Sequence, residues 1–355
     1  MTELELAPPG PGEALVRLHA SGVCHSDLNA IDGTAATRCP AVLGHEGAGV
    51  VEQVGDGVRL ARGTPVVLSW LPACGSCGEC LRGLDHLCSA AWEGMTGGGL
   101  LDGRPRLSRG GEPVYHYSFL STFAERTVVP AACCIPIGAG VPFSVAALVG
   151  CAVATGTGAV WRTAGVSPGD RVAVLGCGGV GMSALLGAVA AGAQPVVAVD
   201  IAPDKLALAE ELGATHAVAW TGSAEDTAER VVDVTGGGVD YAFEATGRQE
   251  AALAAFLSTR ARGAAVLIGI PAADATLTLP ALPIPRMERR VLGSIYGSSR
   301  PARDFPALLE LYRRGRLPLD RLVSRRLPLD DVEKAFGVLR GGESLRVVLD
   351  LEGAT

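Results

Sequence analysis

Residues 171–181 read Arg-Val-Ala-Val-Leu-Gly-Cys-Gly-Gly-Val-Gly, and this stretch decides the fold of the second part of the chain. Its first five residues form an apolar run typical of a buried strand, and glycines then follow at the spacing G-x-G-x-x-G. An Ala- and Leu-rich segment typical of a helix comes next, and Asp200 closes the following apolar run. A strand, a glycine turn, a helix and a carboxylate about 20 residues further on predict a dinucleotide-binding βαβ unit.

The glycine turn also predicts which residues meet the dinucleotide. Glycines let the backbone approach a pyrophosphate, and the helix N-terminus supplies N–H groups and the positive end of its dipole. The candidate cofactor-binding residues of the turn are Gly176, Gly178, Gly179, Val180 and Gly181. Asp200 is expected to bind the adenosine ribose hydroxyls and to repel a 2′-phosphate, which favours NAD over NADP. Lys205 is placed to reach the same ribose, although a solvated lysine fits the sequence almost as well.

The pattern of apolar runs and glycine-rich segments changes along the sequence and predicts two domains. The first comprises residues 1–152 and 296–355, and the second comprises residues 153–295. Between 153 and 295, strand-like apolar runs alternate with helical patterns, which predicts a doubly wound parallel sheet of the α/β class. Residues 1–152 are rich in glycine and proline, and their short strand-like runs predict a β-barrel. These runs are Ala14–His19, Ala48–Val54, Pro65–Ser69 and Ala124–Val129. The tail, with two helical patterns and a final strand over Leu345–Leu351, is assigned to the first domain.

Residues 74–88 carry four cysteines at the spacing Cys-x2-Cys-x2-Cys-x7-Cys, namely Cys74, Cys77, Cys80 and Cys88. Four thiolates close a tetrahedral shell around zinc and leave no open position, which predicts a structural zinc lobe. A zinc knuckle that binds nucleic acid uses the same residues, but lysine is scarce around this segment and the net charge is −7. Disulfides would need an oxidising compartment, which nothing in the sequence suggests.

A second, smaller set of metal-ligand residues consists of Cys24, His45 and Cys151. Three protein ligands leave the fourth position of zinc to water or substrate, which is the pattern of a catalytic zinc. Alone, the sequence Gly44-His45-Glu46 is more typical of a loop histidine with a solvated neighbour. Together with the two cysteines, it favours an open metal site.

Composition limits the remaining possibilities. Of the 355 residues, 48% are hydrophobic and 19% are charged, which supports a large core. The net charge of −7 predicts no nucleic-acid or anionic-membrane partner. Apolar runs such as Arg171–Leu175 and Pro195–Val199 are too short to span a bilayer, and the N-terminus resembles no targeting signal. We therefore expect a cytoplasmic location. The other cysteines, predicted to be small buried residues, are Cys39, Cys133, Cys134 and Cys177.

Taken together, these motifs resemble the zinc-dependent medium-chain alcohol dehydrogenase family, including its class III-like and actinobacterial members. The matching segments follow the family's order over nearly the whole chain: Gly22–Asp27, Gly44–Gly49, the four-cysteine lobe, Gly150–Gly156, the glycine turn and Gly342–Arg346. The resemblance implies a Rossmann domain beside a GroES-like β-barrel domain that carries the structural-zinc lobe. It also implies two zinc ions per chain, NAD as cofactor and a homodimer.

The resemblance assigns roles to individual residues. Cys24, His45 and Cys151 would hold the catalytic zinc, and Glu46 would lie behind the metal and occasionally bind it. Asp27 would accept the outer imidazole N–H of His45 and so fix its tautomer. The residues expected around cofactor and substrate are Thr155 at the nicotinamide, His25 and Arg346 at the pyrophosphate, Trp70, Tyr117 and Tyr296 at the substrate, and Ile270 beside both.

Several residues depart from the family pattern. Ser26 matches the hydroxyl that relays the alcohol's proton, but Asn29 stands where many relatives place a histidine, and an amide is no base near neutral pH. Glutathione-dependent relatives have an arginine at the position of Trp92 and an acid near Thr34, so a glutathione adduct is a poor candidate substrate. The chain also opens at Leu4–Gly10, inside the family's first strands, and we expect a lower stability than in relatives.

The predicted activity is reversible oxidation of an alcohol to an aldehyde or ketone, by hydride transfer from a zinc-bound alkoxide to NAD. Primary, aromatic or allylic alcohols suit an apolar pocket better than polyols. Two related activities stay open: a formaldehyde dehydrogenase that uses a thiol other than glutathione, and a dehydrogenase whose NAD does not exchange. A zinc-stabilised binding protein without activity is the alternative outside the enzymes.

Overall fold

The computed structural model describes residues 2–342 and 345–351, and its chain forms two compact units. Unit 1 comprises Met1–Cys151 and Arg300–Thr355, and unit 2 comprises Ala152–Ser299. The sequence placed these changes after residues 152 and 295. Residues 343 and 344 of the Gly342–Arg346 motif lie outside the described residues.

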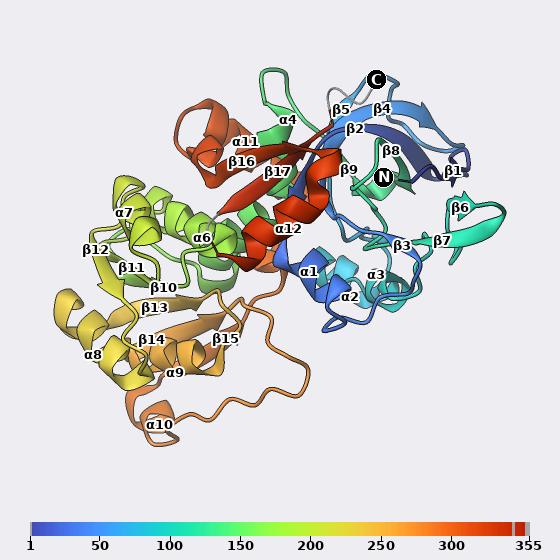
Figure 1. The fold of residues 1–355 in the computed structure, drawn as a ribbon. Helices are drawn as coiled ribbons and strands as arrows, with labels where there is room; N and C mark the ends of the chain where they lie inside the picture. The colour runs from blue at the N-terminus through green and yellow to red at the C-terminus, as the bar shows by residue number, and fades with distance from the viewer. Residues whose placement is uncertain (1, 343–344, 352–355) are drawn as a thin grey trace. The chain divides into compact units, whose positions relative to one another are not determined.

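Unit 2 is built on a six-stranded parallel sheet in the order β12-β11-β10-β13-β14-β15. The strands are β10 (Val172–Leu175), β11 (Val196–Asp200), β12 (His216–Ala219), β13 (Val239–Glu244), β14 (Thr259–Leu267) and β15 (Arg290–Gly293). The helices are α6 (Gly179–Ala190), α7 (Pro203–Glu211), α8 (Ala224–Thr235), α9 (Gln249–Leu257) and the short α10 (Pro283–Met287) (Figure 1). Because the strand order reverses at β10, the carboxyl ends of β10 and β13 form the switch point at which such sheets bind ligands.

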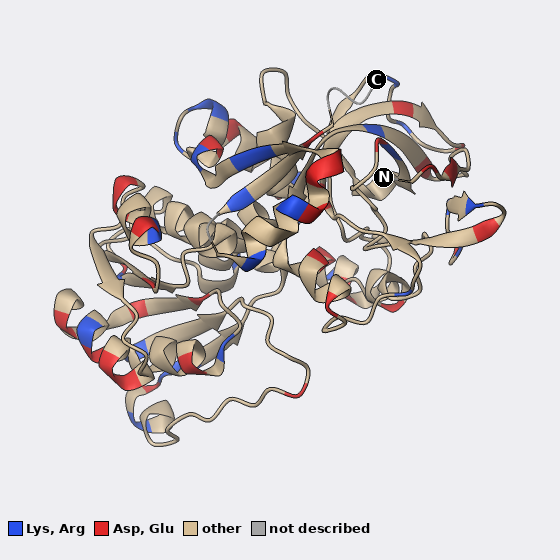
Figure 2. Cartoon of the chain, in the orientation of Figure 1, with Lys and Arg blue, Asp and Glu red and all other residues tan. Residues whose placement is uncertain are grey.

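Burial on both faces explains the apolar strands of unit 2. β10 and β11 are buried along their whole length, as expected for parallel strands covered by helices on each side. Asp200 is the single charged residue in these two strands. Helix α8, in contrast, carries several acidic residues along its length (Figure 2). A charged residue at the end of a fully apolar strand is therefore a candidate for function.

Unit 1 is built on a seven-stranded sheet whose path runs β16-β17-β2-β4-β5-β9, with β8 paired to β2. Its strands are β2 (Glu13–Val23), β4 (Glu46–Val54), β5 (Pro65–Leu68), β8 (Arg126–Pro130), β9 (Cys134–Pro136), β16 (Val323–Pro328) and β17 (Arg346–Asp350). A smaller sheet joins β1 (Glu5–Leu6), β6 (Leu107–Arg109), β7 (Glu112–His116) and β3 (Ala41–Val42). Since β17 pairs antiparallel with β2, the tail of the chain returns to the first sheet, as the sequence indicated.

The helices of unit 1 connect and flank these strands. They are α1 (His25–Ile31), α2 (Gly78–Leu81), α3 (Ser89–Met95), α4 (Phe143–Leu148), α11 (Pro301–Arg313) and α12 (Val332–Arg340). The sequence predicted the last two helices but not the strand β16 between them. It also missed α8 and β15 of unit 2. The buried residues of α8, such as Thr227, Ala228 and Val231, recur at helical spacing, so its sequence carried a helical pattern that the prediction overlooked.

One continuous helical run, Phe143–Ala164, is long and apolar, and it was not predicted from the sequence. It joins α4, the π-helical turn η3 (Val149–Val153), α5 (Ala154–Gly158) and the π-helical turn η4 (Ala159–Ala164). By length and composition it is the one candidate membrane span among the described residues, yet 83% of its apolar window is buried. α4 packs on β2 and β4, and α5 packs on α6, so the burial is that of a core helix.

Two glycines of unit 1 give opposite expectations for the same substitution. A Cβ at Gly49, in β4, would overlap the backbone oxygen of Arg17 in β2, whereas a Cβ at Gly337, inside α12, would meet no atom within 4 Å. Gly49→Ala is expected to lower the free energy of unfolding by about 1–3 kcal/mol. Gly337→Ala is expected to raise it by about 0.5–1 kcal/mol, because alanine loses less backbone entropy in a helix.

Equilibrium denaturation of the two variants, compared with the unmodified protein, checks this pair. Equal effects of the two substitutions would contradict the close approach of β2 and β4 at Gly49.

Candidate active site

Four possible metal ligands from separate parts of unit 1 meet in one place. One ligand atom from each of Cys24, His45, Glu46 and Cys151 lies within 4.8 Å of the others. Cys24 stands between β2 and α1, His45 and Glu46 stand where β4 begins, and Cys151 lies in the π-helical turn after α4. π-helical turns inside helices occur frequently at functional sites. The structure thus brings together the whole set that the sequence proposed for a catalytic metal.

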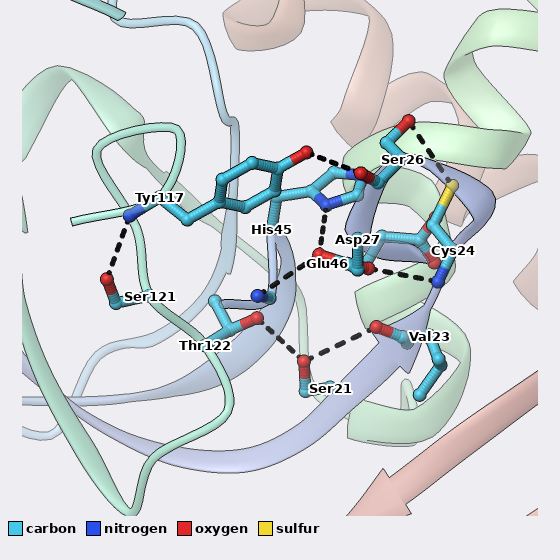
Figure 3. A network of polar contacts seen from close by, with 12 residues as sticks. Ser21, Val23, Cys24, Ser26, Asp27, His45, Glu46, Tyr117, Ser121 and Thr122 are labelled. Carbon is cyan, nitrogen blue, oxygen red and sulfur yellow. Dashed lines mark hydrogen bonds and ion pairs between the residues drawn. The ribbon is translucent and has the colours of Figure 1, made fainter. Parts of the chain in front are cut away.

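The carboxylate of Asp27 joins two of the ligand-bearing segments (Figure 3). Its Oδ1 lies 3.0 Å from Nδ1 of His45 and accepts the backbone N–H of Gly44 at 3.1 Å. Its Oδ2 accepts the backbone N–H of Cys24 at 3.0 Å. The predicted Asp27–His45 contact is present. Donation of the Nδ1 proton to Asp27 leaves Nε2 of His45 as the atom that can bind a metal.

The electrostatics of the site favour a cation. Burial alone would lower the pKa of His45, but the charge of Asp27 and its hydrogen bond outweigh burial and raise that pKa well above its usual value. The hydrogen bond from Cys151 holds the pKa of Cys24 well below that of a free thiol, although burial opposes this shift. The charges of Arg346 and His45 act in the same direction on Cys24. The same hydrogen bond raises the pKa of Cys151, so the two sulfurs share a site that favours one negative charge.

Glu46 and Arg346 form a buried ion pair behind the ligands. Nη1 of Arg346 lies 3.4 Å from Oε1 of Glu46 and donates to the backbone oxygen of Val23 at 3.3 Å. Burial raises the pKa of Glu46 to about 7, while the charge of Arg346 opposes this shift. A Cβ at Gly22 would overlap Oε2 of Glu46, so a larger residue there would have to displace this buried carboxylate. The sequence predicted neither this ion pair nor the role of Gly22, and the pyrophosphate contact of Arg346 stays a prediction.

The donor set fits zinc. Two sulfurs, one imidazole nitrogen and one carboxylate suit zinc better than calcium or magnesium, which prefer oxygen ligands. Within the described residues, both carboxylate oxygens of Glu46 are buried and accept no hydrogen bond, apart from the long ion pair with Arg346. Buried oxygens without hydrogen-bond donors suit a site that receives a cation.

Ser26 and Tyr117 lie beside this group (Figure 3). Oγ of Ser26 is 3.8 Å from Sγ of Cys24. The hydroxyl of Tyr117 donates to the backbone oxygen of Ser26 at 2.8 Å, and its ring meets the His45 ring edge-on at a centroid distance of 5.7 Å. Tyr117 thus contacts the residues of the metal group, and its hydroxyl holds the first turn of α1, which the sequence did not indicate. Its contact with substrate stays a prediction.

The second cysteine group forms a compact lobe in unit 1. Sulfurs of Cys74, Cys77, Cys80 and Cys88 lie within 4.8 Å of one another. Sγ of Cys74 accepts the backbone N–H groups of Ser76 and Cys77, and Sγ of Cys88 accepts that of Cys74 at 3.3 Å. The hydrogen bond from Ser76 is the main reason that the pKa of Cys74 falls to about 6. Four sulfurs at this separation fit a closed tetrahedral zinc site.

The glycine turn of unit 2 has the geometry of a pyrophosphate site. Gly176 follows β10 with φ +91°, Gly178 precedes the first turn of α6, and Gly181 lies so close to Gly176 that a Cβ would overlap its backbone oxygen. Oδ2 of Asp200 accepts the backbone N–H of Cys177 at 2.6 Å, and Oδ1 accepts that of Ala202 at 2.9 Å. Through the hydrogen bond to Cys177, Asp200 holds the glycine turn in place. The sequence pattern did not reveal this contact.

The remaining predicted residues fall on both units. In unit 1, His25 is exposed at the start of α1, and Trp70 is 8% exposed after β5. In unit 2, Thr155 lies in α5, Val180 in α6 and Lys205 in α7, each partly buried. Ile270 is 65% exposed beyond β14, and Tyr296 is 1% exposed in the turn η5 (Tyr296–Ser298). Their contacts with cofactor or substrate stay predictions.

One cysteine prediction is wrong. Cys133, Cys134 and Cys177 are buried as expected, but Cys39 is exposed. It lies in the loop between α1 and β3, directly before Pro40. Apolar character alone does not place a cysteine in the core.

Comparison with known proteins agrees with this geometry. A family model described as an alcohol dehydrogenase GroES-like domain matches residues 10–139, and one described as a zinc-binding dehydrogenase matches residues 179–314. A solved alcohol dehydrogenase zinc-binding domain protein from Burkholderia ambifaria is 36% identical, with 98% of this chain and 94% of that chain covered and a TM-score of 0.94. A benzyl alcohol dehydrogenase from Acinetobacter calcoaceticus is 31% identical, with 98% and 94% covered and a TM-score of 0.92.

A more distant structure concerns the cofactor. A zinc-binding dehydrogenase from Sinorhizobium meliloti, solved with NADP bound, is 26% identical, with 97% of this chain and 94% of that chain covered and a TM-score of 0.78. The first two structures cover nearly all of this chain at more than 30% identity, and the family models match both of its units. The resemblance seen in the sequence is confirmed: the chain belongs to the zinc-dependent medium-chain alcohol dehydrogenase family, whose GroES-like and Rossmann-type domains it shares.

Proposed function

We propose that this oxidoreductase is an NAD-dependent alcohol dehydrogenase that interconverts alcohols with aldehydes or ketones. The observation that carries the proposal is the convergence of Cys24, His45 and Cys151, with Glu46 behind them, in one buried group. We further propose two zinc ions per chain, one at this group and one at the four-cysteine lobe. When bound at the first group, zinc supplies Lewis acidity that lowers the pKa of an alcohol hydroxyl.

The residues around the first group hold and orient its ligands and provide a path for a proton. Asp27 fixes the imidazole of His45 and the backbone of Cys24, so that both ligands are preorganised. The hydroxyl of Ser26, beside Cys24, is the candidate acceptor for the proton that leaves the alcohol. Asn29 does not act as a base, so we propose that water carries the proton onward from Ser26.

Unit 2 would bind the cofactor at its glycine turn. The backbone of Gly176–Gly181 and the N-terminus of α6 supply the pyrophosphate contacts, and Asp200 the ribose contacts. The carboxylate of Asp200 is the main argument for NAD, since it would repel the 2′-phosphate of NADP. The NADP-bound relative shows that this choice needs a direct test.

The pocket residues favour aromatic or other apolar primary alcohols. Trp70 and Tyr117, the residues expected at the substrate, carry large aromatic rings in unit 1, and a benzyl alcohol dehydrogenase is among the similar structures. On the family resemblance, we also propose a homodimer in the cytoplasm.

A substrate screen tests the proposed activity. With NAD supplied, benzylic and short aliphatic alcohols are expected to produce NADH, while polyols are not, because an apolar pocket leaves their hydroxyls without partners. The same screen includes formaldehyde with and without thiols. Turnover of a polyol without turnover of the other alcohols would overturn the proposed substrate class, and thiol-dependent oxidation of formaldehyde alone would favour the alternative activity.

The two metal sites should separate by mutation. Cys151→Ala is expected to lower the zinc content from about two to about one per chain and to abolish alcohol oxidation, because it removes a ligand of the open site only. Elemental analysis after gel filtration measures the zinc. Cys39→Ala, at an exposed cysteine outside both groups, serves as control and should keep both ions. Two zinc ions in the Cys151→Ala variant would contradict the assignment.

Cofactor preference should depend on the charge of Asp200. Asp200→Asn keeps the shape and one acceptor oxygen but removes the negative charge, so the ratio of kcat/KM for NADP over NAD is expected to rise about 10-fold or more, roughly 1.4 kcal/mol. Asp204→Asn, at the first turn of α7, removes an exposed charge nearby and should leave the ratio unchanged. An unchanged ratio in the Asp200→Asn variant would assign selectivity to other residues.

A further inference from the structure

Two tryptophans enclose the four-cysteine lobe of unit 1 and meet each other. Trp70 precedes Cys74, and Trp92 follows Cys88 at the same spacing. Their rings stand edge to face, with centroids 6.0 Å apart and an interplanar angle of 82°. This is a favoured geometry for aromatic pairs. The two ends of the lobe are therefore joined by an aromatic contact as well as by their sulfurs.

Trp92 is tied to the interior of the lobe. Its indole Nε1 donates to the backbone oxygen of His86 at 3.0 Å, and its backbone N–H donates to that of Cys88 at 3.1 Å. His86 and Cys88 are both buried. Cys88 is in turn joined to the other end of the lobe, because its sulfur accepts the N–H of Cys74. The position of the Trp92 ring thus follows from the closed form of the lobe, although the side chain is 38% exposed.

The strand end that leads into Trp70 runs beside the segment that carries Cys151. Trp70 directly follows Leu68 and Ser69, and the backbone N–H of Ser69 donates to Cys133 at 2.8 Å. The backbone oxygen of Leu68 lies against Gly150, where a Cβ would approach to 2.6 Å. Trp70 therefore stands two residues after a strand end that touches Gly150, the residue before the proposed zinc ligand Cys151, and four residues before the first cysteine of the lobe.

From these contacts we propose that Trp92 is a positioning residue that fixes the ring of Trp70 and thereby sets the selectivity among alcohols. The proposal rests on the proposed function, since it takes Trp70 as part of the alcohol pocket. The hydrogen bond to the backbone oxygen of His86 holds Trp92 in place, and the Trp92 ring packs against the ring of Trp70. Trp70 in turn limits the shape of the alcohol that fits.

The first experiment measures the ring contact without substrate. Near-ultraviolet circular dichroism is recorded for the zinc-loaded protein and for Trp70→Leu, Trp92→Leu and the double variant. If the rings are coupled, the two single-variant difference spectra do not add up to that of the double variant. Trp161→Phe, at a tryptophan that donates to Gly187 in unit 2, is the control and should add independently to Trp92→Leu. Additive spectra for Trp70 and Trp92 would overturn the positioning.

The second experiment measures selectivity. Trp92→Leu is expected to raise KM for a benzylic alcohol about 2- to 10-fold, the size of a lost aromatic contact, while kcat and the KM of a short aliphatic alcohol change little. Trp92→Phe keeps a ring but cannot donate to His86, so its KM should lie between those of Trp92→Leu and the unmodified protein. Equal changes for both alcohols would mean a merely structural role and would overturn the proposal.

The two experiments also separate this proposal from the proposed function. If the unmodified protein oxidises no alcohol, the proposed function fails, while the additivity of the spectra still decides whether Trp92 positions Trp70. If alcohols are oxidised but selectivity is unchanged in Trp92→Leu, only the present inference fails.

Discussion

The carboxylate of Asp27 is the interaction on which the rest of the site depends. It is fully buried and accepts hydrogen bonds from the backbone of Cys24, the backbone of Gly44 and the ring of His45. A buried carboxylate is costly unless its oxygens are satisfied, and here the donors that satisfy it are the segments that carry two of the candidate zinc ligands. The cost of burying one charge is thus offset by contacts that also orient the ligands.

The fold brings the third ligand and the balancing charge to the same place. β2 and β4 pair antiparallel, which sets Cys24 and His45 at adjacent strand ends, and the π-helical turn after α4 adds Cys151. The last strand, β17, pairs with β2 and carries Arg346 to Glu46. Removal of either charge would leave the other buried without compensation. A site assembled from both ends of the chain therefore requires the tail to return to unit 1.

Sequence patterns predicted the local parts of this architecture and missed the long-range ones. Glycine spacing, cysteine spacing and apolar runs are local, so the glycine turn, the four-cysteine lobe and most strands of the parallel sheet could be predicted. Other contacts join residues that are separated in the sequence, and a single sequence carries no signal for such pairs. They are the hydrogen bond between Cys177 and Asp200, the ion pair of Glu46 with Arg346, and the hydrogen bond from Tyr117 to Ser26. Helix α8 was missed although its buried residues recur at helical spacing, and Cys39 was misplaced because residue type alone does not determine burial.

The central claim is that Cys24, His45 and Cys151 bind one zinc ion in a position separate from the four-cysteine lobe. Diffraction from crystals of the zinc-loaded protein, collected at the zinc absorption edge, locates the metal directly. The account predicts two anomalous peaks per chain, one of them about 2.3 Å from both sulfurs and about 2.0–2.1 Å from Nε2 of His45. A single peak at the lobe, with the sulfurs of Cys24 and Cys151 turned away from His45, would contradict it.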